Sequence, residues 1–226
     1  MTNTPPKGQP RRSKAAWLLA ASAASAILAL AACKPSSPDS AGAGASGASA
    51  AEALHFNAVD ITGAAYAKQL SLKDVDGKVR SLDEFKGKVV FLFFGYTQCP
   101  DVCPTTMSDL SAVRKKLGAD GDRVQGVFVT VDPERDKPEV LKAYLAAMDP
   151  SFVGLHGSLA ETEAAAKAFK VFYQKVEGRE GAYTIDHTAG AFVFDPQGQV
   201  RLFVRYGMGV DALTADIKQL LSTSGR

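Results

Sequence analysis

An uninterrupted apolar run, Val89 to Phe94, leads directly into a segment that carries two cysteines, Cys99 and Cys103. Six consecutive apolar residues without alternation are typical of a strand that is buried on both faces. Residues 104–117 then show the apolar spacing of an amphipathic helix, and proline is tolerated in the first turn of a helix. The chain therefore places both thiols where a buried strand turns into a helix.

A helix start favours the ionised form of a thiol. Unpaired backbone N–H groups and the helix dipole lower the pKa of a cysteine there, and the thiolate either attacks a disulfide or binds a metal ion. Cys99 and Cys103 are separated by three residues, one more than in thioredoxin-type redox motifs. Residues four apart in helical geometry lie on one face, so the two sulfurs can approach each other. This arrangement allows a disulfide and equally allows a shared metal ion such as Cu(I) or Zn(II).

The remaining pattern predicts one α/β domain over residues 55–226. The expected elements are a hairpin of strands 70–74 and 79–81 around an Asp-Gly turn, a strand at 124–131, a helix from a capping box at 136–139 to 148, a helix at 160–172, a hairpin of strands 191–194 and 200–204, and a helix at 211–221. Two βα units, a hairpin and a final helix, with the dithiol at the first strand-to-helix turn, form the thioredoxin-like order. We therefore expect a thioredoxin-like fold, with a central mixed sheet flanked by helices.

The N-terminus is typical of an export signal. Four basic residues within positions 7–14 precede an uncharged Ala/Leu-rich stretch, residues 15–32, which ends in Leu30-Ala31-Ala32-Cys33. This ending resembles the lipobox of bacterial lipoproteins, so we expect residues 1–32 to be a signal peptide and Cys33 to carry lipid. Residues 33–54 then form a flexible Ala/Gly/Ser linker. An uncleaved membrane helix over the same stretch is the alternative.

The charge pattern argues against a nucleic-acid partner. Residues 1–32 hold four of the 26 basic side chains and none of the 24 acidic ones, so the exported part is close to neutral. It carries no stripe of Lys and Arg interleaved with aromatic residues. It also contains no Gly-rich phosphate loop and no nucleophilic-serine motif, so nucleotide and hydrolase chemistry have no support.

His187 is the candidate that favours a metal ion over peptide exchange. It lies in the segment 183–190 before the strand at Ala191, a loop that a thioredoxin-like order brings close to the dithiol. Thioredoxins hold a cis-proline there that binds extended substrate chains, and residues 183–191 contain no proline. Asp186 is a candidate to orient His187 through a hydrogen bond. Met208 is interpreted as a core or loop residue rather than a copper ligand.

At these positions the chain resembles the Sco (SenC) proteins, the copper chaperones of cytochrome c oxidase assembly. Four motifs of that family occur in order, over a resemblance that covers about residues 60–222: Gly95 to Pro104, Thr130 to Asp136, Asp186 to Thr188 and Asp195 to Gly198. The chain departs from the pattern at Gln98, where many members have histidine. Within the second motif, Asp132, Arg135 and Asp136 are interpreted mainly as turn and cap residues, with a role in lining the site or contacting a partner as the alternative.

The resemblance implies that Cys99, Cys103 and His187 bind one copper ion, as Cu(I) or Cu(II), and that the protein delivers it to the copper-binding subunit of cytochrome c oxidase. It implies a lipid-anchored domain in the periplasm of the bacterial cell envelope, with a thiol reductant or copper donor as a further partner. We expect the inner membrane, although Lys34 after the lipidated cysteine favours outer-membrane sorting.

Two enzyme functions compete with copper delivery. The stronger is a thiol-disulfide oxidoreductase that reduces the cysteines of the oxidase subunit through a redox-active Cys99–Cys103 pair. The weaker is a peroxiredoxin-like peroxidase, for which the chain lacks the proline expected ahead of the reactive cysteine. The sequence leaves copper delivery and thiol reduction open.

Overall fold

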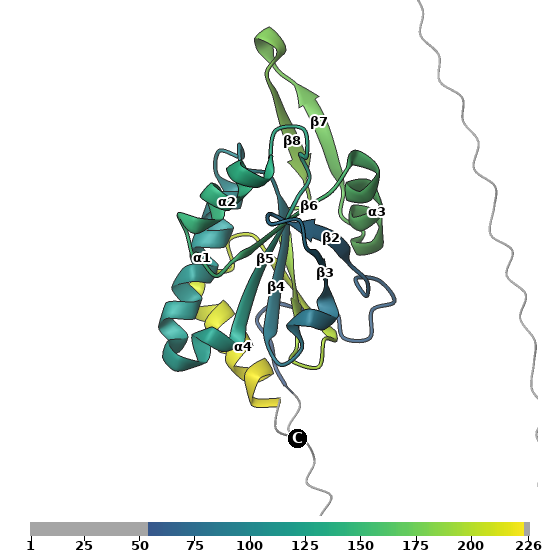
Figure 1. Ribbon diagram of the computed structural model, residues 1–226. Coiled ribbons are helices and arrows are strands. Elements are labelled where there is room, and N and C mark those ends of the chain that lie inside the picture. The colour runs from purple at the N-terminus through teal and green to yellow at the C-terminus, as the bar shows by residue number, and fades with distance from the viewer. Residues whose placement is uncertain (1–53, 224–226) are drawn as a thin grey trace, which may run out of the picture. The chain divides into compact units, whose positions relative to one another are not determined.

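The computed structural model describes residues 54–223, which form a mixed eight-stranded sheet with helices on both faces (Figure 1). The strands of this sheet are β1 (Val59–Asp60), β2 (Ser71–Asp74), β3 (Val79–Ser81), β4 (Val89–Gly95), β5 (Val124–Thr130), β6 (Val153–His156), β9 (Gly190–Phe194) and β10 (Val200–Arg205). The helices are α1 (Val102–Leu117), α2 (Pro138–Ala146), α3 (Leu159–Phe169) and α4 (Val210–Ser222), with short 3-10 turns at Leu82–Phe85, Gly118–Arg123 and Arg179–Gly181. None of the helices within residues 54–223 has both the length and the hydrophobicity to span a membrane.

Strand β4 organises the sheet, whose order is β1-β10-β9-β4-β5-β6-β2-β3. It pairs parallel with β5 and antiparallel with β9, so that Phe93 lies beside both Phe128 and Ala191. Every residue of β4 and β5 is buried, as a strand flanked by neighbours and covered on both faces requires. The carboxyl ends of β4 and β5 and the amino end of β9 consequently lie at the same edge of the sheet.

Helix α3 covers the face opposite to α1 and α4 (Figure 1). Its last residue, Phe169, is fully buried and contacts the aromatic rings of Phe94, Phe192 and Phe194 at centroid distances of 5.2, 5.3 and 6.4 Å. These rings come from β4, which ends at the shared edge, and from β9, which begins there. The cluster thereby holds helix and sheet together behind that edge.

Strands β7 (Tyr173–Glu177) and β8 (Tyr183–His187) form a separate two-stranded ribbon, which projects from the edge of the main sheet in Figure 1. Sequence reasoning left this ribbon out and placed His187 in a loop. Its signal was present, because two short runs flank Gly178 and Gly181, the residues that favour a hairpin turn.

The structure confirms the predicted α/β class with a central mixed sheet flanked by helices, and it confirms both predicted hairpins of that sheet. Helix α1 begins at Val102 rather than at 104, which places Cys103 inside its first turn. The predicted capping box at Asp136 is wrong: Lys137 occupies the cap position of α2 without a side-chain hydrogen bond. Asp136 is instead 1% exposed and its carboxylate turns inward.

The aromatic cluster predicts a large difference between two nearby phenylalanines. Replacing the buried Phe169 with alanine leaves a cavity between α3 and the sheet, so Phe169→Ala should lower the free energy of unfolding by about 3–5 kcal/mol. Phe172 is 60% exposed, so Phe172→Ala should change it by no more than about 0.5 kcal/mol. Urea denaturation followed by circular dichroism measures both, and equal losses would contradict the packing described.

Candidate metal centre

The two thiols lie in different environments at the start of α1. The Sγ atom of Cys103 is buried beneath the helix, with no exposed area, whereas Cys99 is half-buried in the preceding turn. The backbone N–H of Cys103 donates a hydrogen bond to the Sγ atom of Cys99 at 3.4 Å. This donor is one of the N–H groups of the helix start that have no partner within the helix, so the Cys99 sulfur caps the first turn of α1.

Gly95, the last residue of β4, makes room for the inner thiol. A Cβ atom at this position would lie 2.9 Å from the Sγ atom of Cys103 and 2.8 Å from the ring of Phe93. Real Cβ atoms do not approach other atoms so closely, so a side chain here would displace the sulfur. The glycine of the first motif therefore has a packing role directly under Cys103.

The imidazole of His187 reaches the same point from the ribbon. Its Nε2 atom lies 3.3 Å from the Sγ atom of Cys103. The ring packs edge-on against Phe93 and Tyr96, at centroid distances of 5.8 and 5.9 Å. The Nδ1 atom lies 3.1 Å from the carbonyl oxygen of Thr188. A proton on Nδ1 would be donated to that oxygen, and the lone pair of Nε2 would then face the thiols.

The Sγ atoms of Cys99 and Cys103 and a ring nitrogen of His187 all lie within 4.8 Å of one another. Two sulfurs and one imidazole nitrogen are a soft donor set, suited to Cu(I) and to the borderline ion Zn(II). The structure thus brings together the three side chains that the sequence singled out. Their role as ligands is taken up below as a proposal.

Burial governs the protonation of the site. It raises the pKa of the Cys103 thiol well above its ordinary value, and the neighbouring Cys99 adds to the effect. Burial also lowers the pKa of His187, against smaller opposing contributions from the Thr188 carbonyl and Asp186. At neutral pH the buried groups are therefore an uncharged thiol and an uncharged imidazole.

Asp136 braces the turn before Cys99, a role that sequence reasoning missed. Its carboxylate accepts hydrogen bonds from the backbone N–H and the hydroxyl of Thr97, at 3.0 and 2.6 Å, and from the hydroxyl of Thr130 at 2.6 Å. Burial raises the pKa of Asp136, while the two threonines oppose that shift. Threonine is common in both strands and turns, so nothing in the sequence around Thr97 or Thr130 indicated that they bind a buried carboxylate.

Three other residues that the sequence singled out, Asp186, Gln98 and Met208, do not belong to this cluster of thiols and imidazole. Asp186 is exposed and precedes His187 on β8, and neighbouring residues of a strand point to opposite faces, so the hydrogen bond expected between them does not form. The Thr188 carbonyl takes that position. The side chain of Gln98 accepts a hydrogen bond from Arg135 at 3.2 Å. Met208 packs against the core, as expected. Cys33 lies outside the described residues.

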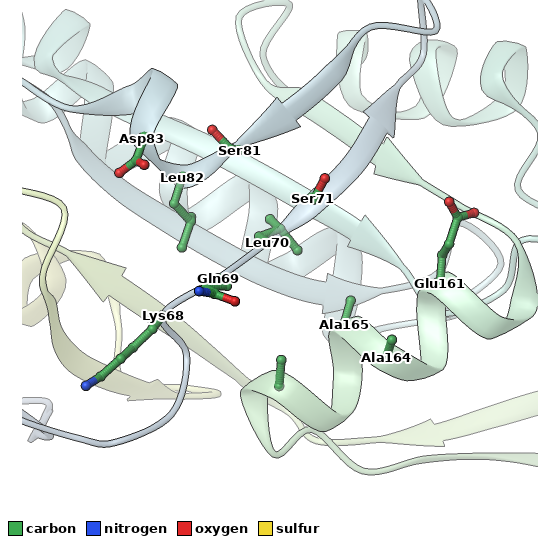
Figure 2. Close-up of a pocket in the computed structure, with 11 residues that line it drawn as sticks. Lys68, Gln69, Leu70, Ser71, Ser81, Leu82, Asp83, Glu161, Ala164 and Ala165 are labelled. Carbon is green, nitrogen blue, oxygen red and sulfur yellow. The ribbon is translucent and has the colours of Figure 1, made fainter.

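A surface pocket of about 470 Å³ lies apart from this centre, between α3 and the hairpin of β2 and β3 (Figure 2). Leu70 and Leu82 line it from the hairpin side, and Ala165 and Glu161 line it from α3. The lining includes none of the two cysteines and the histidine. The geometry for metal chemistry is therefore at the sheet edge and not in this pocket.

Comparison with known proteins gives one family and close structural neighbours. The family model described as SCO1/SenC matches residues 59–222. A SCO2-like protein of Rickettsia felis is 36% identical over 130 residues, which are 57% of this chain and 63% of that protein. The aligned segment thus spans less than two thirds of that relative's length.

Two solved structures cover most of the described residues. The solution structure of apo Sco1 from Thermus thermophilus is 42% identical, covers 74% of this chain and 98% of its own, and has a TM-score of 0.67. The structure of ScoI from Bradyrhizobium japonicum with copper bound is 38% identical, covers 68% and 98%, and has a TM-score of 0.62.

Two less similar structures are those of an oxidase assembly protein and of a lipoprotein. BsSco, a member of the Sco family of cytochrome c oxidase assembly proteins with a disulfide switch, is 27% identical over 74% of this chain and 98% of its own, with a TM-score of 0.55. A SCO1/SenC family lipoprotein from Bacillus anthracis is 25% identical over 67% of this chain and 92% of its own, with a TM-score of 0.57.

Proposed function

The chain belongs to the SCO1/SenC family, and on that premise we propose that it is a metallochaperone that binds copper and delivers it to cytochrome c oxidase. The observation that carries the proposal is the convergence of Cys99, Cys103 and His187 within 4.8 Å. Copper is bound in a 38% identical relative of the same fold, and cytochrome c oxidase assembly is the function stated for the family of a more distant one.

The donor set supports copper as the cargo. Two thiolates and one imidazole suit Cu(I), because thiolate sulfur is a soft, polarisable ligand. The cargo would leave by ligand exchange with the copper-binding subunit of the oxidase. Cys99 is the more exposed of the two thiols, so an incoming ligand would meet Cys99 before the buried Cys103.

The N-terminal prediction gives this function its place in the cell. We infer that residues 1–32 are removed, that Cys33 carries the lipid, and that residues 33–54 tether the domain to the inner membrane on its periplasmic side. The relative described as a lipoprotein supports this anchoring. Because the periplasm is oxidising, a thiol reductant would be needed to keep Cys99 and Cys103 able to bind copper.

The unequal environments of the two thiols favour reduction of a disulfide as a second candidate function. In that reaction the Cys99 thiolate attacks a disulfide of the oxidase subunit and releases one partner thiolate. Cys103, after losing its proton, then attacks the mixed disulfide and releases the second thiolate. The partner gains two electrons and the chain is left with a Cys99–Cys103 disulfide. The relative with a disulfide switch supports this candidate.

Copper binding has a direct test in His187→Ala. The reduced parent protein should bind about one Cu(I) per chain, and loss of the imidazole should weaken binding at least tenfold, because one of three ligands is removed. Competition with a chromophoric Cu(I) chelator measures the affinity, and His156→Ala serves as the control histidine. Equal affinity of His187→Ala and parent would contradict the proposed ligand set.

Copper affinity should rise with pH between 6 and 8. The raised pKa of Cys103 means that its thiol loses a proton on binding copper, so affinity should grow about tenfold per pH unit for each proton released. The lowered pKa of His187 leaves its imidazole neutral above pH 7, so His187→Ala should keep the same slope there. Chelator competition at pH 6, 7 and 8 measures the slope, and a flat profile would oppose this account.

The second candidate predicts a trapped intermediate. Reduced Cys103→Ser protein should form a stable mixed disulfide through Cys99 with the oxidised copper-binding domain of the oxidase subunit, because no second thiol is left to release it. Cys99→Ser should form none. Non-reducing gel electrophoresis and mass spectrometry detect the adduct, and its absence in both variants would remove the thiol-reductase candidate.

A further inference from the structure

The turn between β5 and α2, residues 131–137, contacts both segments that carry the metal-ligand candidates. On the ribbon side, the phenol of Tyr183 donates to Oδ1 of Asp132 at 2.9 Å, and Nη1 of Arg135 donates to the carbonyl oxygen of Tyr183 at 2.9 Å. On the cysteine side, the same Nη1 atom donates to Oε1 of Gln98, the neighbour of Cys99, at 3.2 Å. One guanidinium group therefore joins the ribbon to the cysteine-bearing turn.

The opposite charges of Asp132 and Arg135 form an ion pair that is largely shielded from solvent. The side chain of Asp132 is 2% exposed and forms an ion pair with Nε of Arg135, whose side chain is 20% exposed. The guanidinium also lies 3.5 Å from the ring centroid of Tyr183, a cation–π contact at close range. Loss of water around the phenol and its bond to Asp132 raise the pKa of Tyr183 to about 12, so its O–H remains a donor at neutral pH.

Tyr183 and His187 stand at the two ends of one face of β8. Residues four apart in a strand point to the same side and lie about 13 Å from each other along it. Ile185, between them, is buried against the domain. Because β8 pairs only with β7 among the described strands, the backbone hydrogen bonds of the main sheet do not hold it. Contacts at the Tyr183 end therefore influence where the imidazole of His187 lies.

We propose that Arg135, acting with Asp132 and Tyr183, is the positioning residue of the metal centre: it fixes the His187-bearing ribbon against the turn that carries Cys99. The inference rests on the proposed copper site for its metal readout, but its structural part applies to the metal-free protein. The hydrogen bonds and ion pair of Arg135 go to Asp132, Gln98 and Tyr183 and not to the three candidate ligands, so it acts through the segments that carry them. Lysine would keep the charge at this position but not the forked contact with Asp132, Gln98 and Tyr183.

A double-mutant cycle separates positioning from general stabilisation. Residues that support metal ligands from outside typically alter affinity 10–100-fold, so Arg135→Met should weaken Cu(I) binding about tenfold in the parent. In the His187→Ala background the same change should cost nothing further, because no imidazole remains to be positioned. An unchanged affinity in the parent, or an equal loss in both backgrounds, overturns the proposal.

Two further variants guard against a folding artefact. Tyr183→Phe removes only the phenol O–H and should weaken copper binding in the same direction by a smaller factor. Arg80→Met is the matched control. Arg80 lies on β3, its side chain is similarly exposed at 22%, it forms an ion pair with Asp74, and its guanidinium lies 5.6 Å from the ring centroid of Phe85. It should leave copper affinity unchanged, and a loss equal to that of Arg135→Met overturns the proposal.

Hydrogen exchange on the metal-free protein distinguishes failure of this inference from failure of the copper proposal. Arg135→Met should speed amide exchange of the peptide covering 183–189 at least tenfold, while that of β5 stays as in the parent. If the parent binds no copper but this acceleration occurs, the positioning role stands and the proposal that the site binds copper is overturned. Unchanged exchange at 183–189 overturns the positioning role whatever the copper result.

Discussion

The pairing of β4 with β5 on one side and β9 on the other determines where chemistry can occur in this chain. Parallel pairing brings the ends of β4 and β5 to one edge, and antiparallel pairing brings the beginning of β9 to the same edge. The cysteine turn, the turn of residues 131–137 and the ribbon all leave the sheet there. Cys103 and His187 are 84 positions apart in sequence, yet the Sγ atom of the one lies 3.3 Å from the Nε2 atom of the other.

The sequence predicted what depends on local pattern and on motif identity. The apolar run at 89–94 identified β4, and the segment after it was predicted to carry both thiols at a strand-to-helix turn, although only Cys103 lies inside α1 and Cys99 lies in the turn before it. His187 was selected through the missing proline and the ordered motifs. These inferences needed no knowledge of which distant side chains meet.

What the sequence did not predict depends on tertiary contact. Asp136 resembles a helix cap in sequence, but its carboxylate turns inward to the hydroxyls of Thr130 and Thr97, and the contact with Thr97 spans 39 positions. Asp186 resembles a partner of His187 because they are adjacent, yet strand geometry sends them to opposite faces. The ribbon was missed because most of its side chains are exposed, so hydrophobic periodicity is weak over β7 and β8.

Cys103 is buried as an uncharged thiol, beside the half-buried and uncharged imidazole of His187. The folded state therefore does not depend on a metal ion to neutralise charge at the site. In small zinc domains the metal supplies the free energy of folding, so removal of the ion unfolds the chain. Here the eight-stranded sheet and its aromatic cluster form a core in which the three candidate ligands lie at one edge. This thiol and imidazole leave no charge of their own behind when such a site empties, which suits the proposed role as a reusable copper carrier.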